Sequence, residues 1–116
     1  MTDALVVFTT TAEEAQAEIL ARLLVDKQIS ACVQIIGRIR SFYRWQGEVQ
    51  SANESLIIIK TTRQAYAAVE EAIKTMHRES GGYETPEIIA LPVEGGALEY
   101  LEWLTGSIVA GRIIEG

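Results

Sequence analysis

The sequence contains little cysteine and few basic residues. Its one cysteine, Cys32, cannot close a disulfide within the chain, which agrees with a reducing compartment. Ten Lys and Arg face sixteen Asp and Glu, a formal net charge of -6, and the basic residues are scattered instead of forming a stripe. Because such a chain would be repelled by phosphates, we expect no nucleic-acid partner.

Long apolar runs are also absent. No run approaches the roughly 20 residues that a membrane-spanning helix needs, and the N-terminus lacks the basic start of a secretory signal. We therefore expect a cytoplasmic protein without a membrane partner. A length of 116 residues predicts one domain, over residues 1–109, and the tail 110–116, which has no clear period, is expected to be mobile.

Recognised catalytic motifs are missing as well. The chain has no Gly-x-Ser-x-Gly elbow, no phosphate-binding loop ending in Gly-Lys-Ser/Thr, and no His-Glu-x-x-His pair. We therefore expect that the protein is not an enzyme and requires no cofactor.

The first half of the chain alternates between strand and helix patterns. Residues 4–8 form an unbroken apolar run, typical of a central strand. Thr11 and Glu14 match a capping box, and a helix is predicted from there to about Lys27. Its expected apolar face consists of Ala15, Ile19, Leu20, Leu23 and Leu24.

A long hairpin is predicted next. Residues 31–43 are rich in β-formers, and the alternation changes phase at Gly37, as a β-bulge would make it. Gly47 provides a turn, and the chain returns through Val49 to the apolar run 56–59.

The second half repeats the alternation. Residues 64–77 have helical spacing, residues 78–82 are predicted to be a loop, and a last strand follows Pro86 over residues 87–91. A short third helix is expected after Gly96, with Leu101 and Leu104 on its apolar face.

This order predicts an α/β (α+β) fold: a ferredoxin-like split β-α-β sandwich with a long hairpin and a C-terminal helix. Two helices can cover only one face of such a sheet. Because the other apolar face must also be buried, we expect the chain to associate with copies of itself.

Cys32 and His77 are the candidate metal ligands. Cys32 stands in a β-rich run, where a thiol usually packs as a small apolar group, and His77 ends the predicted second helix, where it would interact with the helix dipole. Both also have the ligand chemistry that copper or zinc prefers, so a metal role remains an alternative for each.

A second set of residues has the chemistry of an interface or a ligand cleft. Aromatic side chains at the hairpin tip suit contacts between subunits, or stacking on a ligand. Edge protection and solvated charge can explain Lys60 and the polar groups around Pro86, but these groups would form a polar ligand pocket if they converge with His77. The candidate cleft residues are Tyr43, Trp45, Lys60, Tyr83, Glu84 and Glu87.

Five motifs carry a family resemblance. They are Ser30-Ala31-Cys32-Val33, Tyr43-Arg44-Trp45-Gln46-Gly47, Ile59-Lys60-Thr61-Thr62, Tyr83-Glu84-Thr85-Pro86-Glu87 and Ala90-Leu91-Pro92-Val93. Because these five motifs occur in this order, the sequence resembles the CutA divalent-cation tolerance family. The resemblance implies a cytosolic homotrimer, similar in architecture to the nitrogen-regulatory PII trimers, and a link to tolerance of copper and other divalent ions.

The resemblance also implies roles for single residues. Cys32 and His77 match proposed copper ligands, and Tyr43, Trp45, Lys60, Tyr83 and Glu87 match positions around a cleft between subunits. The family runs His-Pro-Tyr-Glu, whereas residues 78–82 stand between His77 and Tyr83 here. We expect this insertion to separate the two side chains.

Three functions are therefore weighed. The first is a trimeric divalent-cation tolerance protein that binds copper or another divalent cation. The second is a PII-like trimeric sensor that binds a small anionic metabolite through Lys60 and the tyrosines. The third, an enzyme, has no activated nucleophile or acid-base pair to support it.

Overall fold

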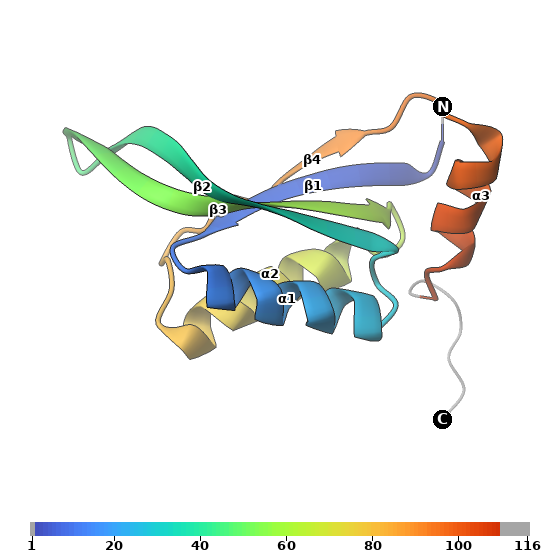
Figure 1. Cartoon of the computed structure of the whole chain (residues 1–116), viewed down its shortest axis with the longest axis horizontal. Coiled ribbons are helices and arrows are strands. Elements are labelled where there is room, and N and C mark those ends of the chain that lie inside the picture. The colour runs from blue at the N-terminus through green and yellow to red at the C-terminus, as the bar shows by residue number, and fades with distance from the viewer. Residues whose placement is uncertain (1, 110–116) are drawn as a thin grey trace.

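The protein, whose residues 2–109 are described by a computed structural model, contains one four-stranded sheet and three helices (Figure 1). The elements are β1 (Ala4–Thr11), α1 (Glu14–Asp26), β2 (Cys32–Trp45), β3 (Glu48–Thr62), α2 (Tyr66–Ser80), β4 (Ile89–Pro92) and α3 (Leu98–Gly106). The strand order is β2-β3-β1-β4, and all neighbours are antiparallel. Since β3 lies between the parallel strands β1 and β2, the predicted ferredoxin-like fold is confirmed.

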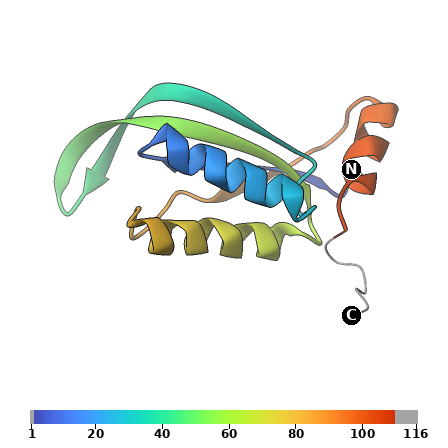
Figure 2. The same cartoon turned by 60° about the horizontal axis from the view of Figure 1, so that its bottom comes forward.

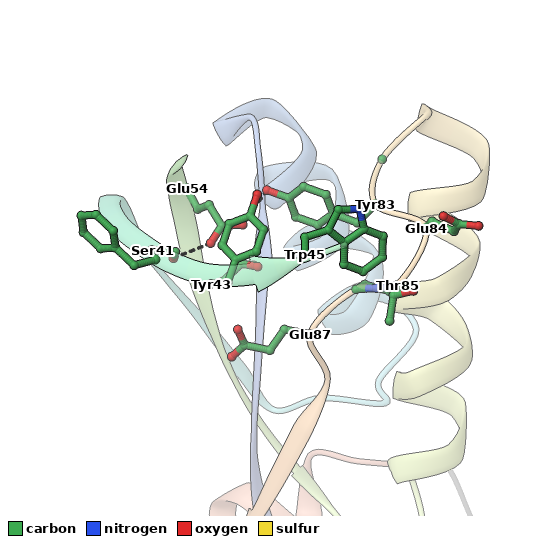
Figure 3. Close-up of a pocket in the computed structure, with 12 residues that line it drawn as sticks. Ser41, Tyr43, Trp45, Glu54, Tyr83, Glu84, Thr85 and Glu87 are labelled. Atoms are coloured by element: carbon green, nitrogen blue, oxygen red, sulfur yellow. Dashed lines mark hydrogen bonds between the residues drawn. The ribbon is translucent and has the colours of Figure 1, made fainter. Parts of the chain in front are cut away.

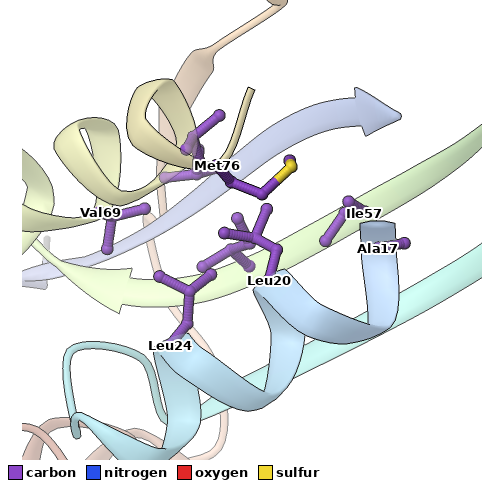
Figure 4. Packing of buried hydrophobic residues seen from close by; sticks show 9 residues of the cluster. Ala17, Leu20, Leu24, Ile57, Val69 and Met76 are labelled. Carbon is purple, nitrogen blue, oxygen red and sulfur yellow. The ribbon is translucent and has the colours of Figure 1, made fainter. Parts of the chain in front are cut away.

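Helices α1 and α2 cover one face of the sheet (Figure 2). Leu20 and Leu24 of α1 pack against Val69 and Ile73 of α2 and against Ile57 of β3, all with no exposed surface (Figure 4). Truncating such a side chain to alanine typically costs about 2–5 kcal/mol. This layer is therefore the main source of the stability of the fold.

The start of α1 differs from the prediction. Strand β1 continues through Thr11, whose hydroxyl donates to the Glu13 carbonyl at 2.8 Å, and Glu13 is the N-cap residue. Gln16 accepts the Glu13 N–H at 3.1 Å, so the capping box lies two positions later than predicted. The face is shifted as well, because Ala17 is buried whereas Ile19 is 63% exposed.

The hairpin closes as predicted. Trp45 pairs with Glu48, and Gln46 and Gly47 have φ values of 52° and 83°. Two residues of positive φ are typical of a type I′ turn, whose twist matches that of the strands.

The bulge at Gly37 is confirmed, and it decides which side chains reach the site described below. Gly37 and Arg38 together oppose one residue of β3, and Arg38, not the glycine, has the positive φ of 61°. Before the bulge, even-numbered residues such as Ile36 face away from the helices. Because one extra residue reverses the alternation, Tyr43 and Trp45 follow that same face after it.

The second half of the chain holds two corrections. Helix α2 runs to Ser80, so residues 78–80, predicted as loop, are helical, and Gly81 ends the helix with a φ of 69°. Strand β4 begins only at Ile89, two residues later than predicted.

Helix α3 lies at one end of the sheet and is anchored by a second apolar cluster, which contains Ala4, Ala65, Leu104 and Ile108 (Figure 1). The tail 110–116, predicted to be mobile, lies outside the described residues.

Within residues 2–109, no helix covers the sheet face opposite α1 and α2 (Figures 1 and 2). This face carries an apolar set that alternates with the inward residues along the paired strands: Val6, Phe8, Ile36, Leu56, Ile58, Ile89 and Leu91. Ile36, Ile89 and Leu91 are about half exposed in the single chain. We call these residues the open face. Across residues 2–109, no helix is long and apolar enough to cross a bilayer.

Candidate functional site

A pocket of about 790 Å³ lies where the hairpin passes the segment that connects α2 to β4 (Figure 3). Its lining residues are Thr10, Ser41, Phe42, Tyr43, Trp45, Glu54, Gly82, Tyr83, Glu84, Thr85, Pro86 and Glu87. Five of the six predicted cleft residues are among them. The sixth, Lys60, lies elsewhere.

Glu54 is the most buried charge of the pocket. It is 9% exposed, and its two carboxylate oxygens accept hydrogen bonds of 2.5 Å from the Ser41 and Tyr83 hydroxyls. Ser41 and Glu54 are diagonal neighbours across the hairpin, since Glu54 pairs with Ile39. These bonds tie the hairpin to the segment after α2.

The environment of Tyr83 keeps its hydroxyl protonated. Burial raises the pKa of Tyr83 well above its ordinary value, and the adjacent Glu54 carboxylate raises it further. Tyr83 therefore keeps its proton at neutral pH and donates a hydrogen bond to Glu54.

His77 supports the pocket wall from behind. It is 2% exposed, lies one turn before the end of α2, and its Nδ1 accepts the Tyr83 N–H at 3.0 Å. The two rings stack with centroids 5.3 Å apart. The expectation that the insertion separates His77 from Tyr83 is therefore wrong.

Two glycines explain this geometry. Gly81 adopts the left-handed conformation that reverses the chain after α2, and the Gly82 N–H donates to the His77 carbonyl at 2.7 Å. A Cβ on Gly82 would collide with the imidazole and lie 3.2 Å from the His77 Cα. The tight reversal returns the chain to the histidine in six residues, which the length of the insertion alone did not suggest.

The protonation of His77 follows from its contacts. Burial lowers the pKa of His77, and an interaction with the Thr10 backbone offsets this only in part. Because Nδ1 accepts a hydrogen bond from the Tyr83 N–H, the neutral ring carries its own proton on Nε2. Nε2 is buried and has no hydrogen bond of ordinary geometry within residues 2–109.

Cys32 and His77 do not come together in one chain. Cys32 pairs with Lys60, which in turn pairs with Val6, and all three belong to the open-face register, whereas His77 is on the opposite side of the sheet near Thr10. Val6 and Thr10 are four residues apart on β1, about 13 Å along the strand. Cys32 itself is partly exposed instead of buried.

The residues of one chain therefore do not fit a copper site. With Nδ1 accepting a hydrogen bond and Nε2 protonated, the His77 ring has no free lone pair for a metal. Among residues 2–109, no three His, Cys, Asp or Glu side chains are grouped to hold an ion. A closed site needs about four ligands.

Lys60 belongs to the other end of the sheet. Its ammonium lies 3.3 Å from the Tyr100 hydroxyl and 5.4 Å from the centre of that ring, so it contacts α3. The lining of the pocket holds three carboxylates, those of Glu54, Glu84 and Glu87, and none of the lining residues is a lysine or arginine.

Sequence reasoning did not identify Ser41 and Glu54. Counting back from the turn at Gly47 would have placed them as diagonal partners across the hairpin, and a carboxylate before an apolar run was the available signal. Their burial depended on the segment after α2, which the sequence did not place.

A family model described as "CutA1 divalent ion tolerance protein" matches residues 5–107. The chain belongs to this CutA family. The "Divalent-cation tolerance protein CutA" of Thermus thermophilus is 42% identical over 99 residues, which cover 85% of this chain and 92% of that protein. The chloroplastic "Protein CutA 1" of rice is 41% identical and covers 89% of this chain, but this chain spans only 56% of the rice protein.

Solved CutA structures share the fold. The Thermus thermophilus divalent cation tolerance protein superposes with a TM-score of 0.85 at 40% identity, covering 90% of this chain and 98% of its own. Rice CutA1 superposes with a TM-score of 0.85 at 39% identity, and the match covers 92% of this chain and 94% of the rice chain. A family member from Archaeoglobus fulgidus, 35% identical with a TM-score of 0.83 and coverage of 90% and 97%, is described as periplasmic.

Proposed function

We propose that this chain is a homotrimeric, non-enzymatic ligand-binding protein that contributes to tolerance of divalent cations. The observation that carries this proposal is the pocket between the hairpin and residues 82–87, where a buried carboxylate and aromatic rings converge (Figure 3). A large pocket with a few convergent polar groups is the usual form of a ligand site. Tolerance is the function that the names of the similar CutA proteins describe.

The trimer is supported by surface that one chain leaves uncovered. The open face is apolar, and the hairpin extends beyond the helices with Phe42 68% and Val49 66% exposed. Exposed apolar patches of this kind mark association surfaces. Three interlocked hairpins would bury more than the roughly 1,200–2,000 Å² of an ordinary interface, so the assembly should survive dilution.

Direct binding of copper or another divalent cation is a second candidate, expected from Cys32 and His77. It requires donors from more than one chain, because these two residues lie on opposite sides of the sheet. It also requires that His77 give up its hydrogen bond from Tyr83. The third candidate, a PII-like sensor of anions, has less support, because the pocket is acidic and Lys60 is remote from it.

The compartment also stays a proposal. A cytoplasmic setting rests on the single cysteine, which agrees with a reducing compartment, whereas the similar proteins include chloroplastic and periplasmic ones.

Complementation tests the proposal. In a bacterium that lacks its own CutA-family gene and is sensitive to copper, the wild-type chain should restore growth on copper. The Trp45→Ala variant, which lacks one wall of the pocket, should not restore growth. The Trp103→Phe variant, which is changed on α3, should restore it. Light scattering at micromolar concentration should report a trimer. A monomer, or equal rescue by both variants, would contradict the proposal.

A further inference from the structure

We propose that the pocket takes an organic cation with N–H donors, a primary amine or diamine, and neither an anion nor a bare metal ion. This inference rests on the proposed function, in which the pocket is the ligand site, and it specifies the chemical class of that ligand. It follows from the buried carboxylate, from the aromatic side chains beside it, and from the size of the cavity.

Glu54 lacks a counter-charge. Buried carboxylates are normally paired with a cation, because removing a charge from water is costly. Glu54 is nine-tenths buried and lines the pocket, yet within residues 2–109 it forms no ion pair, and its hydrogen-bond partners are two neutral hydroxyls. A carboxylate has about four acceptor positions, so Glu54 can still receive N–H donors from a ligand.

Aromatic side chains complete a cation site. Tyr43 and Trp45 line the pocket and are 44% and 42% exposed in the single chain, so part of each ring is not covered by the chain's own residues (Figure 3). A cation near the face of such a ring is attracted to its π electrons, and tryptophan is the strongest partner. The methylene groups of an alkylamine would cover the same rings and gain apolar contact.

The size of the cavity argues against a bare metal ion as its occupant. About 790 Å³ is far more than one ion fills, and divalent calcium needs six to eight oxygens at about 2.3–2.6 Å. The described acidic side chains are not clustered into such a group. Glu54 belongs to β3 and Glu87 to the segment before β4, and both line the pocket, so a diamine has two carboxylates available to it.

Fluorescence can test the inference in the full chain. The sequence has two tryptophans, so Trp103→Phe leaves Trp45 as the only indole reporter, inside the pocket. Titration with 1,4-diaminobutane should change its emission in a saturable way, whereas glutarate and copper(II) chloride, each added alone, should not. In this background Glu87→Gln should weaken diamine binding about tenfold, because the side-chain oxygen still accepts a hydrogen bond but the negative charge that strengthens it is lost.

A matched control separates site from surface charge. Glu94→Gln removes an exposed carboxylate that does not line the pocket, and it should leave the diamine affinity unchanged. Glu54→Gln should weaken binding at least as much as Glu87→Gln. Since Glu54 is buried, Glu87→Gln keeps the test valid if the Glu54 variant fails to fold.

The outcomes distinguish this inference from the proposed function. Saturation by glutarate or by copper alone would overturn the amine assignment and leave the pocket as the ligand site. Equal effects of Glu87→Gln and Glu94→Gln would also overturn it. No response to any of the three additives would overturn the amine assignment and, in addition, remove the main support for the proposed function.

Discussion

Replacing Gly82 with alanine should destabilise this protein far more than an exposed loop substitution normally does. The new Cβ would collide with the His77 ring, which is packed behind the pocket wall, and would press on the His77 backbone at 3.2 Å. Overpacking of this kind costs about 1–3 kcal/mol. Displacing the loop instead would break the Tyr83 N–H bond to Nδ1, which costs a similar amount. We expect a loss of about 1–3 kcal/mol, because avoiding the collision breaks the hydrogen bond and keeping the hydrogen bond leaves the collision.

Two other glycines provide matched controls for this prediction. At Gly95 an added Cβ meets nothing within 4 Å, so Gly95→Ala should leave the free energy of unfolding nearly unchanged. At Gly81 the space is also open but φ is 69°, so Gly81→Ala isolates backbone strain and should cost about 1–2 kcal/mol. Urea unfolding at one fixed protein concentration measures all three. If Gly82→Ala matches Gly95→Ala, the contact with His77 is not what the structure indicates.

Three further predictions concern acid, copper and assembly. The pKa of His77 is lowered in the folded chain, so the unfolded chain binds a proton on this ring more readily. The free energy of unfolding should therefore be highest above about pH 6.5 and should fall below it. The urea midpoint should drop more between pH 7.5 and pH 5.5 for wild type than for His77→Asn. The same variant should bind copper as wild type does by calorimetry, since neither ring nitrogen offers a free lone pair, and a tenfold loss of affinity would show the reverse. Trp45→Ala should weaken trimer assembly more than Trp103→Ala in sedimentation experiments, because Trp45 is on the hairpin and Trp103 on a terminal helix; equal losses would contradict the assignment of the hairpin to the interface.

Local patterns predicted the elements well where the chemistry is local. The phase change at Gly37 and the turn at Gly47 both depend on a few consecutive residues, and both are where the alternation placed them. The end of α2 was predicted three residues too early, since polar residues after His77 resemble a loop when their helix contacts are unknown. The residue that marks the end of α2 is Gly81, because the left-handed conformation at the end of the helix favours a glycine there.

The sequence by itself determined the family and the order of strands and helices, because periodicity and short motifs record local preferences. It also predicted six cleft residues, of which five line the pocket. Only the tertiary structure decided which polar groups meet. Cys32 and His77 were both candidate metal ligands, but β-strand alternation places Cys32 on the face without helices, and α2 holds His77 on the other face. Glu54 was not predicted as a pocket residue, but the turn at Gly81 and Gly82 brings Tyr83 back to the hairpin, where it donates a hydrogen bond to Glu54. A contact between residues so far apart in the chain cannot be read from the periodicity of the sequence.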